Sequence, residues 1–260
     1  MLSYAIKRVI RSLGLFAALL LGVVLASTFF AGVNVGADTT AKAALNQQLN
    51  RVPVDIVIGQ YGSQASSSTV WTAAASEVAN VSGINGSEVI SRAYWWGNTT
   101  FENYTSFRIV GISNASHVYD GLTITSGAGS LEENETYVWA GSKIADKIEL
   151  NSTLTLNLTY WAGGDYPQGE KAVSLSLKVV GFVELDDKAY SITTGEVYTP
   201  IMYQYTQQQS QAIYQDSLLI VNWEETFSKL LDAMPSYSSP FSTQILAYLN
   251  RDALINPWDI

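Results

Sequence analysis

The sequence contains no cysteine among its 260 residues, and His117 is its single histidine. The lack of cysteine excludes a disulfide scaffold and any metal site built on thiolates, although it does not decide the cellular compartment. One imidazole without thiolate partners also argues against a transition-metal centre. We therefore predict a fold held by an apolar core, with no bound metal and no cofactor.

Charge is scarce as well, at 14% of residues, and it is unbalanced: 14 basic against 23 acidic side chains give a net charge of -9. A nucleic-acid partner is excluded because phosphate binding needs basic patches. The sequence also lacks a Gly-x-Ser-x-Gly elbow, a Walker loop, a His-Glu-x-x-His pair and an EF-hand loop. Ser174, Ser176 and Lys178 would allow a Ser–Lys dyad, but alternating polar residues on a half-exposed strand explain them more simply. No enzymatic activity is predicted.

One long apolar run is present near the start, where residues 13–35 carry no charge. About 20 apolar residues cross the hydrocarbon core of a bilayer, so this run is long enough to span it. Lys7, Arg8 and Arg11 precede the run and Asp38 follows it. By the positive-inside rule the N-terminus is cytoplasmic and the bulk of the chain is extracellular. We predict a basic cytoplasmic or interfacial segment at 1–12 and a transmembrane helix at 13–36, in contact with the lipid bilayer.

A cleaved secretory signal is the alternative for this run, since residues 35–37 resemble a cleavage site. Signal h-regions run about 7–15 residues, which is shorter than the run observed, so its length favours a retained anchor. The longest later apolar run, residues 218–221, is expected to be a strand and not a second span.

Asn-x-Ser/Thr sequons are unusually frequent and all fall between residues 80 and 160. With 14 Asn and 48 Ser plus Thr in 260 residues, chance predicts 14 × 48/260, or about 2.6 sequons, and eight are present. The acceptor asparagines are Asn80, Asn85, Asn98, Asn103, Asn114, Asn134, Asn151 and Asn157. They indicate N-glycosylation of an extracellular surface. A Ser/Thr/Asn-rich β surface that produces sequons by composition alone remains the alternative.

After the span the pattern predicts an α+β protein. A helical stalk is expected at 37–52, ended by Pro53, followed by a two-lobed, strand-rich ectodomain at 53–260 with an inserted lobe at about 113–185. Strands are expected at 54–58, 88–95, 106–112, 137–140, 153–160, 173–185, 217–222 and 244–249. Helices are expected at 67–81, at 142–148 with Ser142 as N-cap, and at 224–233.

Other segments give weaker signals. Residues 113–131 are expected to be irregular, Glu132, Glu133 and Glu135 to form a solvated turn, and Asp186 with Asp187 to end a strand, while 192–205 shows no clear pattern. Trp95 with Trp96, and the tyrosines of 198–214, are interpreted either as a binding surface or as buried core.

Several segments in fixed order resemble a known family. They are residues 5–9 (AIKRV), 108–112 (RIVGI), 137–145 (YVWAGSKIA), 175–182 (LSLKVVGF) and 218–221 (LLIV) before an acidic helix. Together they resemble the MacB/FtsX-type ABC transporter permeases, in which a basic N-terminal helix and first span lead directly into a stalk and an α+β ectodomain. Each motif is weak alone, and their order and spacing carry the resemblance.

The resemblance implies a permease subunit that does not itself hydrolyse ATP. It implies a cytoplasmic ABC ATPase partner, a homodimer or a heterodimer with another permease, and export or extracytoplasmic movement driven through the first span. Permeases of this family have further spans after the ectodomain, whereas this sequence ends at Ile260 without one, so a fragment and a one-span relative both remain open. The alternative function is a surface-anchored glycoprotein with a binding or structural role and no ATPase partner. A membrane-tethered hydrolase is a third reading, for which the motifs provide nothing.

Overall fold

The computed structural model describes residues 2–49, 51–59, 67–97, 105–161, 170–195, 217–233 and 241–251. The chain divides into two units, residues 1–51 and residues 52–260. The first unit is one α-helix, α1 (Leu2–Leu49), unbroken through the predicted span and the predicted stalk. One stretch of it, Ala17–Leu49, is long and apolar enough to cross a membrane. The chain is therefore helical over the predicted span and over residues 37–49 of the predicted stalk.

The second unit is built on one mixed sheet of nine strands. The strands are β1 (Ile56–Gly59), β2 (Ile84–Gly97), β3 (Thr105–Ile112), β4 (Leu122–Gly127), β5 (Glu135–Trp139), β6 (Thr153–Trp161), β7 (Glu170–Leu185), β8 (Ser217–Asn222) and β9 (Phe241–Leu249). Their order is β1-β9-β2-β3-β8-β5-β7-β4, with β6 paired to β7 off this path. Two pairs, β3 with β8 and β5 with β7, are parallel and the rest are antiparallel.

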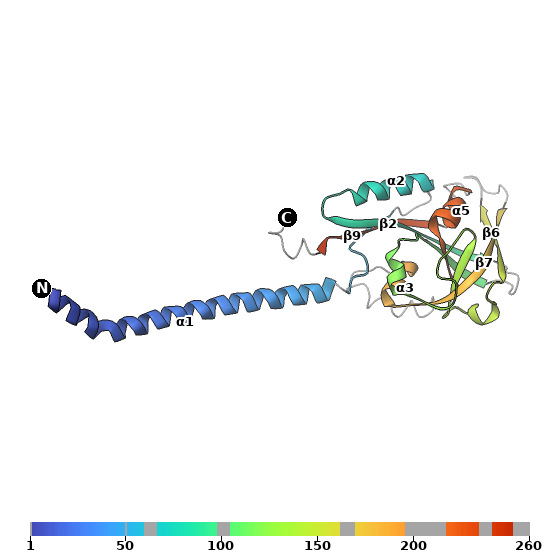
Figure 1. The fold of residues 1–260 in the computed structure, drawn as a ribbon. Coiled ribbons are helices and arrows are strands. Elements are labelled where there is room, and N and C mark those ends of the chain that lie inside the picture. Colours follow the sequence, from blue (N-terminus) through green and yellow to red (C-terminus); the bar gives the residue numbers. More distant parts are fainter. Residues whose placement is uncertain are drawn as a thin grey trace. The chain divides into compact units, whose positions relative to one another are not determined.

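Helices cover both faces of the sheet (Figure 1). On one face, α2 (Ser68–Ala79) and α5 (Ser228–Ala233) bury Trp71 and Leu230 in an apolar cluster; we call this the α2/α5 face. On the other, α3 (Asp187–Thr194) and the 3₁₀ helix η1 (His117–Gly121) bury Ile192 and Val118; we call this the α3 face.

Strand β8 shows how one short sequence serves both faces. All six of its residues are buried. Leu219 and Val221 enter the cluster of the α2/α5 face, while Leu218 and Ile220 enter that of the α3 face. This is the two-residue alternation of an extended strand, applied in the centre of a sheet where neither side meets water. An α+β fold with a strand-rich ectodomain is confirmed.

Most of the predicted elements are found, and three assignments were wrong. Residues 113–131 are not irregular but contain η1 and β4, an edge strand whose short, glycine-bearing sequence gives little periodic signal. No α-helix starts at Ser142: only the 3₁₀ turn η2 (Ala145–Lys147) forms, with Ile144 before it. The hydroxyl of Ser142 instead accepts the backbone N–H of Leu218, which ties this turn to β8.

The third wrong assignment concerns the acidic pair after β7. Asp186 does not end a strand in a plain turn but is the N-cap of α3, where its Oδ1 accepts the N–H of Ala189 at 2.8 Å. Helix α3 ends at Gly195, whose φ of +79° is the left-handed conformation that glycine adopts without strain. The predicted helix at 224–233 is present, and it begins with a π-helical turn, η3 (Trp223–Phe227), before α5.

Candidate functional site

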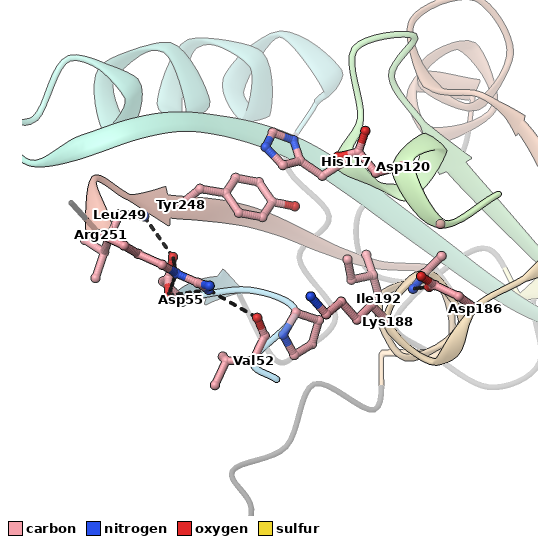
Figure 2. A pocket seen from close by; sticks show the side chains of 13 residues that line it. Val52, Asp55, His117, Asp120, Asp186, Lys188, Ile192, Tyr248, Leu249 and Arg251 are labelled. Atoms are coloured by element: carbon pink, nitrogen blue, oxygen red, sulfur yellow. Dashed lines mark hydrogen bonds and ion pairs between the residues drawn. The ribbon is translucent and has the colours of Figure 1, made fainter. Parts of the chain in front are cut away.

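The sheet ends in a polar cavity where the chain enters the second unit. The cavity has a volume of about 380 Å³ and lies among β1, η1, α3 and the end of β9. Its lining residues are Val52, Pro53, Asp55, His117, Asp120, Gly121, Asp186, Lys188, Ala189, Ile192, Tyr248, Leu249 and Arg251 (Figure 2). Residues 52–55, which we call the junction segment, form one wall.

An ion pair holds the junction segment to the end of β9. The carboxylate of Asp55 accepts from Arg251 at 2.9 Å and 3.1 Å, and also from the backbone N–H of Leu249 at 2.9 Å. The guanidinium of Arg251 donates in addition to the carbonyl of Val52 at 3.1 Å. The Asp55 side chain is only 6% exposed, so this bidentate pair is shielded from water and stronger than a surface ion pair. We call it the Asp55–Arg251 clasp (Figure 2).

A second polar group fixes η1 to the sheet. The rings of His117 and Tyr248 stack at 3.9 Å between centroids and 8° between planes. Both residues meet Glu88, a 6% exposed carboxylate of β2: the hydroxyl of Tyr248 and the backbone N–H of His117 donate to its Oε1. Burial, and then the charge of Glu88, raise the pKa of Tyr248 well above its ordinary value. Tyr248 therefore stays a hydrogen-bond donor at every physiological pH.

Among the described residues, the lining of this cavity offers no serine, threonine or cysteine nucleophile beside His117. Within the part of the chain that the structure describes, no three His, Cys, Asp or Glu side chains are placed to hold a metal ion. Lys178, one member of the formal Ser–Lys dyad, pairs with Glu135 at 3.5 Å, and Glu133 pairs with Lys229. These four charged groups therefore form two ion pairs.

The predicted site residues are distributed over both units. Lys7 and Arg8 are exposed on α1; Arg11 lies on the same helix, and its side chain is outside the described set. Asn80, Asn85, Asn114, Asn134, Asn151 and Asn157 are all exposed, while Asn98 and Asn103 lie outside the described residues. The tyrosines of 198–214 also lie outside, as do the side chains of Trp95 and Trp96.

Two of the exposed acceptors have a conformational reason to be asparagine. Asn134 and Asn151 have φ values of 58° and 64°, and asparagine tolerates this left-handed region better than most side chains. The turns before β5 and β6 would therefore favour these residues without any glycan. The left-handed turn conformation does not, however, require a Thr two positions after either asparagine.

The sequence reasoning missed Asp55, Glu88 and Arg251. A signal for Glu88 was present: it is a charged residue at an inward position of β2, two residues before Ile90. A charge in such a position predicts a buried polar partner. The partner of Asp55, 196 residues away in the chain, could not be read from the sequence.

Comparison with known proteins gives structural neighbours but no match in sequence. No family model and no curated protein sequence matches the chain. Among solved structures, it is similar to the extracellular domain of the noncanonical ABC-type transporter YknZ from Gram-positive bacteria, at 12% identity and a TM-score of 0.37, over 78% of this chain and 95% of that one. It is also similar to the periplasmic region of MacB from Actinobacillus actinomycetemcomitans, at 13% identity and a TM-score of 0.40, over 78% and 80% of the two chains. A permease-protein domain from Porphyromonas gingivalis matches at 10% identity and a TM-score of 0.36, over 76% of each chain. These neighbours are an extracellular domain, a periplasmic region and a domain of a permease protein.

Proposed function

We propose that this chain is the ectodomain-bearing part of an ABC transporter permease, which couples ATP hydrolysis by a cytoplasmic partner to movement or export outside the membrane. The observation that carries the proposal is the connection between helix and sheet. Helix α1 continues without a break to Leu49, and after six residues the chain enters β1 at Ile56. The intervening junction segment is fixed to β9 by the Asp55–Arg251 clasp. A rigid element joined to a clasped segment is what transmission of motion requires.

The membrane orientation is part of the proposal. The apolar stretch from Ala17 supports a span at 13–36, with the stalk at 37–52 and the ectodomain beyond. Lys7, Arg8 and Arg11 precede it, which supports a cytoplasmic N-terminus and an extracellular ectodomain.

The four ectodomain segments of the family resemblance provide further support. They are strands β3, β8, β5 and β7, and these four are consecutive neighbours in the sheet. The glycines of two motifs also have steric reasons. A Cβ on Gly111 would lie 2.5 Å from the Cβ of Phe227, and one on Gly181 would lie 2.9 Å from the carbonyl oxygen of Ser126. The residues that carry the resemblance therefore lie in neighbouring strands of the sheet and at their close contacts.

The first experiment is affinity purification of the tagged protein from native membranes in mild detergent, with mass spectrometry of the proteins that accompany it. We expect an ABC-type ATPase in near-stoichiometric amount. Recovery of envelope proteins alone would contradict the proposal and favour the surface-anchored glycoprotein. The mass of the purified complex would also show whether the permease subunit is a homodimer or pairs with a second permease.

A second experiment tests transmission through the helix. Replacing Ala41 and Lys42 by glycine weakens the stalk by about 1 kcal/mol per residue and should uncouple ATP hydrolysis from movement of the ectodomain. The matched control is Lys42→Ala, which removes the ion pair of Lys42 with Asp38 at 3.1 Å but keeps a good helix former. Transport should be lost in the double-glycine variant and retained in the control. Equal transport by both would contradict a rigid transmitting stalk.

A further inference from the structure

Six sequons have a described, exposed asparagine, and in five of them, all but that of Asn157, the side chain that carries the hydroxyl two residues later is described as well. These five differ in the exposure of that hydroxyl group. The acceptor motif requires Ser or Thr at that position, so the modifying enzyme must reach the hydroxyl as well as the asparagine amide. Burial of the hydroxyl in the folded domain therefore closes a sequon even where its asparagine faces solvent.

Two sequons keep the hydroxyl open. Asn80 follows α2, and Asn80, Val81 and Ser82 are all exposed. In the turn before β6, Asn151 and Thr153 are exposed, and Ser152 between them is half-buried. Both the amide and the hydroxyl of these sequons can be reached without unfolding.

Two other sequons have the hydroxyl locked into the core. Thr136, the partner of Asn134, is 0% exposed, and its hydroxyl donates to the carbonyl of Ile220 in β8 at 3.0 Å. Ser116, the partner of Asn114, is 4% exposed and accepts the N–H of Val118 at the start of η1. Reaching either hydroxyl requires β5 to leave β8 or η1 to leave the sheet. The Asn85 sequon lies between the two classes, because Ser87 is half-buried and donates to the carbonyl of Ala75 at 2.6 Å.

We propose that the folded ectodomain accepts N-linked glycans at Asn80 and Asn151, and that Asn114 and Asn134 accept them only before the domain folds. In the reaction, Nδ2 of the asparagine attacks the anomeric carbon of an oligosaccharide carried on a polyprenyl diphosphate. The N–C bond forms, the bond from that carbon to the phosphate oxygen breaks, the lipid diphosphate leaves, and a proton from Nδ2 passes to a base of the transferase. The asparagine and the hydroxyl come from this chain, while the donor and the transferase are membrane components.

The test uses the full chain purified in detergent and a membrane oligosaccharyltransferase that needs only Asn-x-Ser/Thr, with its lipid-linked donor. The folded chain and the urea-unfolded chain, diluted directly into the reaction, are compared by mass spectrometry of each sequon. In the folded chain we expect glycans on Asn80 and Asn151, and rates at Asn114 and Asn134 at least about tenfold lower, because these need a local opening. In the unfolded chain all four sites should be modified at similar rates.

Substitutions distinguish the requirement for the hydroxyl group from the general effect of folding on the modification rate. Thr136→Val should abolish modification of Asn134, and Thr153→Val that of Asn151, in both the folded and the unfolded chain. This result would show that each hydroxyl group is required for modification of its sequon. Phe227→Ala, which loosens the core, should raise the rate at Asn134 in the folded chain and leave that at Asn80 unchanged. Equal rates at Asn134 and Asn151 in the folded chain would overturn the proposal, and so would a folded chain that refuses Asn80, or an unfolded chain that accepts no glycan. None of these outcomes depends on an ATPase partner, so the permease proposal is tested separately.

Discussion

The two faces of the sheet bury different chemistry. The α2/α5 face is filled by apolar side chains, with the aromatic rings of Phe227 and Phe241 5.4 Å apart in an edge contact. The α3 face also has an apolar centre, but the two buried charged residues of the described chain, Glu88 and Arg92, both lie on it, on the same strand. Both faces contain buried hydrogen bonds, such as the one that the Trp223 indole of the α2/α5 cluster donates to Ser91, but within the described residues only the α3 face adds buried charges.

The charges of the α3 face hold the elements that border the cavity. Arg92 donates to the carbonyls of Ile192 and Thr193 at the end of α3, and Arg108 donates to that of Thr194. Cations are favourable at this end of a helix, where the carbonyls carry partial negative charge. These bonds fix the C-terminal end of α3 to β2 and β3.

The largest expected effect is on the apolar face. Phe227→Ala should lower the free energy of unfolding by about 3–5 kcal/mol, because its fully buried ring packs on Gly111 and Phe241. Guanidinium unfolding in detergent would measure it. Phe227→Leu is the matched control and should cost less than half as much. A loss below about 1 kcal/mol for the alanine variant would contradict the close packing of this ring on the α2/α5 face.

On the α3 face, Arg92→Met should cost about 2–4 kcal/mol, since it removes the charged donor to the buried carbonyls of Ile192 and Thr193. The control Arg108→Met removes a single part-buried bond and should cost about 1 kcal/mol. Hydrogen exchange should show the loss concentrated in residues 187–194. If exchange rose equally over α2, the two faces would not differ in the way described.

A smaller effect is expected at the other end of α3. Asp186→Ala removes the N-cap and should cost about 1 kcal/mol. Asp187→Ala, one residue further, removes only a charge from the first turn and should cost about 0.3 kcal/mol. Thermal unfolding of the two variants side by side distinguishes a specific hydrogen bond from a general preference for acidic residues, and equal losses would argue against the cap.

The last prediction concerns pH. The pKa of Tyr248 is raised in the fold, above its unfolded value near 10, chiefly by burial and then by Glu88. A raised pKa gives stability that is complete below about pH 10 and is lost as the pH rises above it, because the unfolded chain then releases the proton more readily. Tyr248→Phe should be less stable at pH 7, having lost its bond to Glu88, but should lose less on going from pH 9 to 11. An unchanged alkaline slope would contradict this role, after allowance for Tyr119, whose pKa is raised to about 12.

Prediction from sequence succeeded where the pattern was local and long. The long helix α1 and helix α2 follow from composition and a helical period, and β3, β7 and β8 from runs of Val, Ile and Leu. It failed at β4 and α3, which are short and rich in polar or small residues. Ser142 was misread because serine is a common N-cap residue, whereas here its hydroxyl accepts a hydrogen bond from a strand 76 residues away.

The sequence by itself determined the long apolar helix, its basic flank, the sequons and the α+β character, because each depends on neighbours within a few turns or strands of the chain. Only the tertiary structure decided that β3, β8, β5 and β7 lie side by side, that Asp55 meets Arg251, and that Thr136 is hidden while Thr153 is open. These depend on contacts between residues far apart in the chain. Local propensity leaves such pairings undetermined, because many registers satisfy it, and burial of both faces of one sheet selects among them.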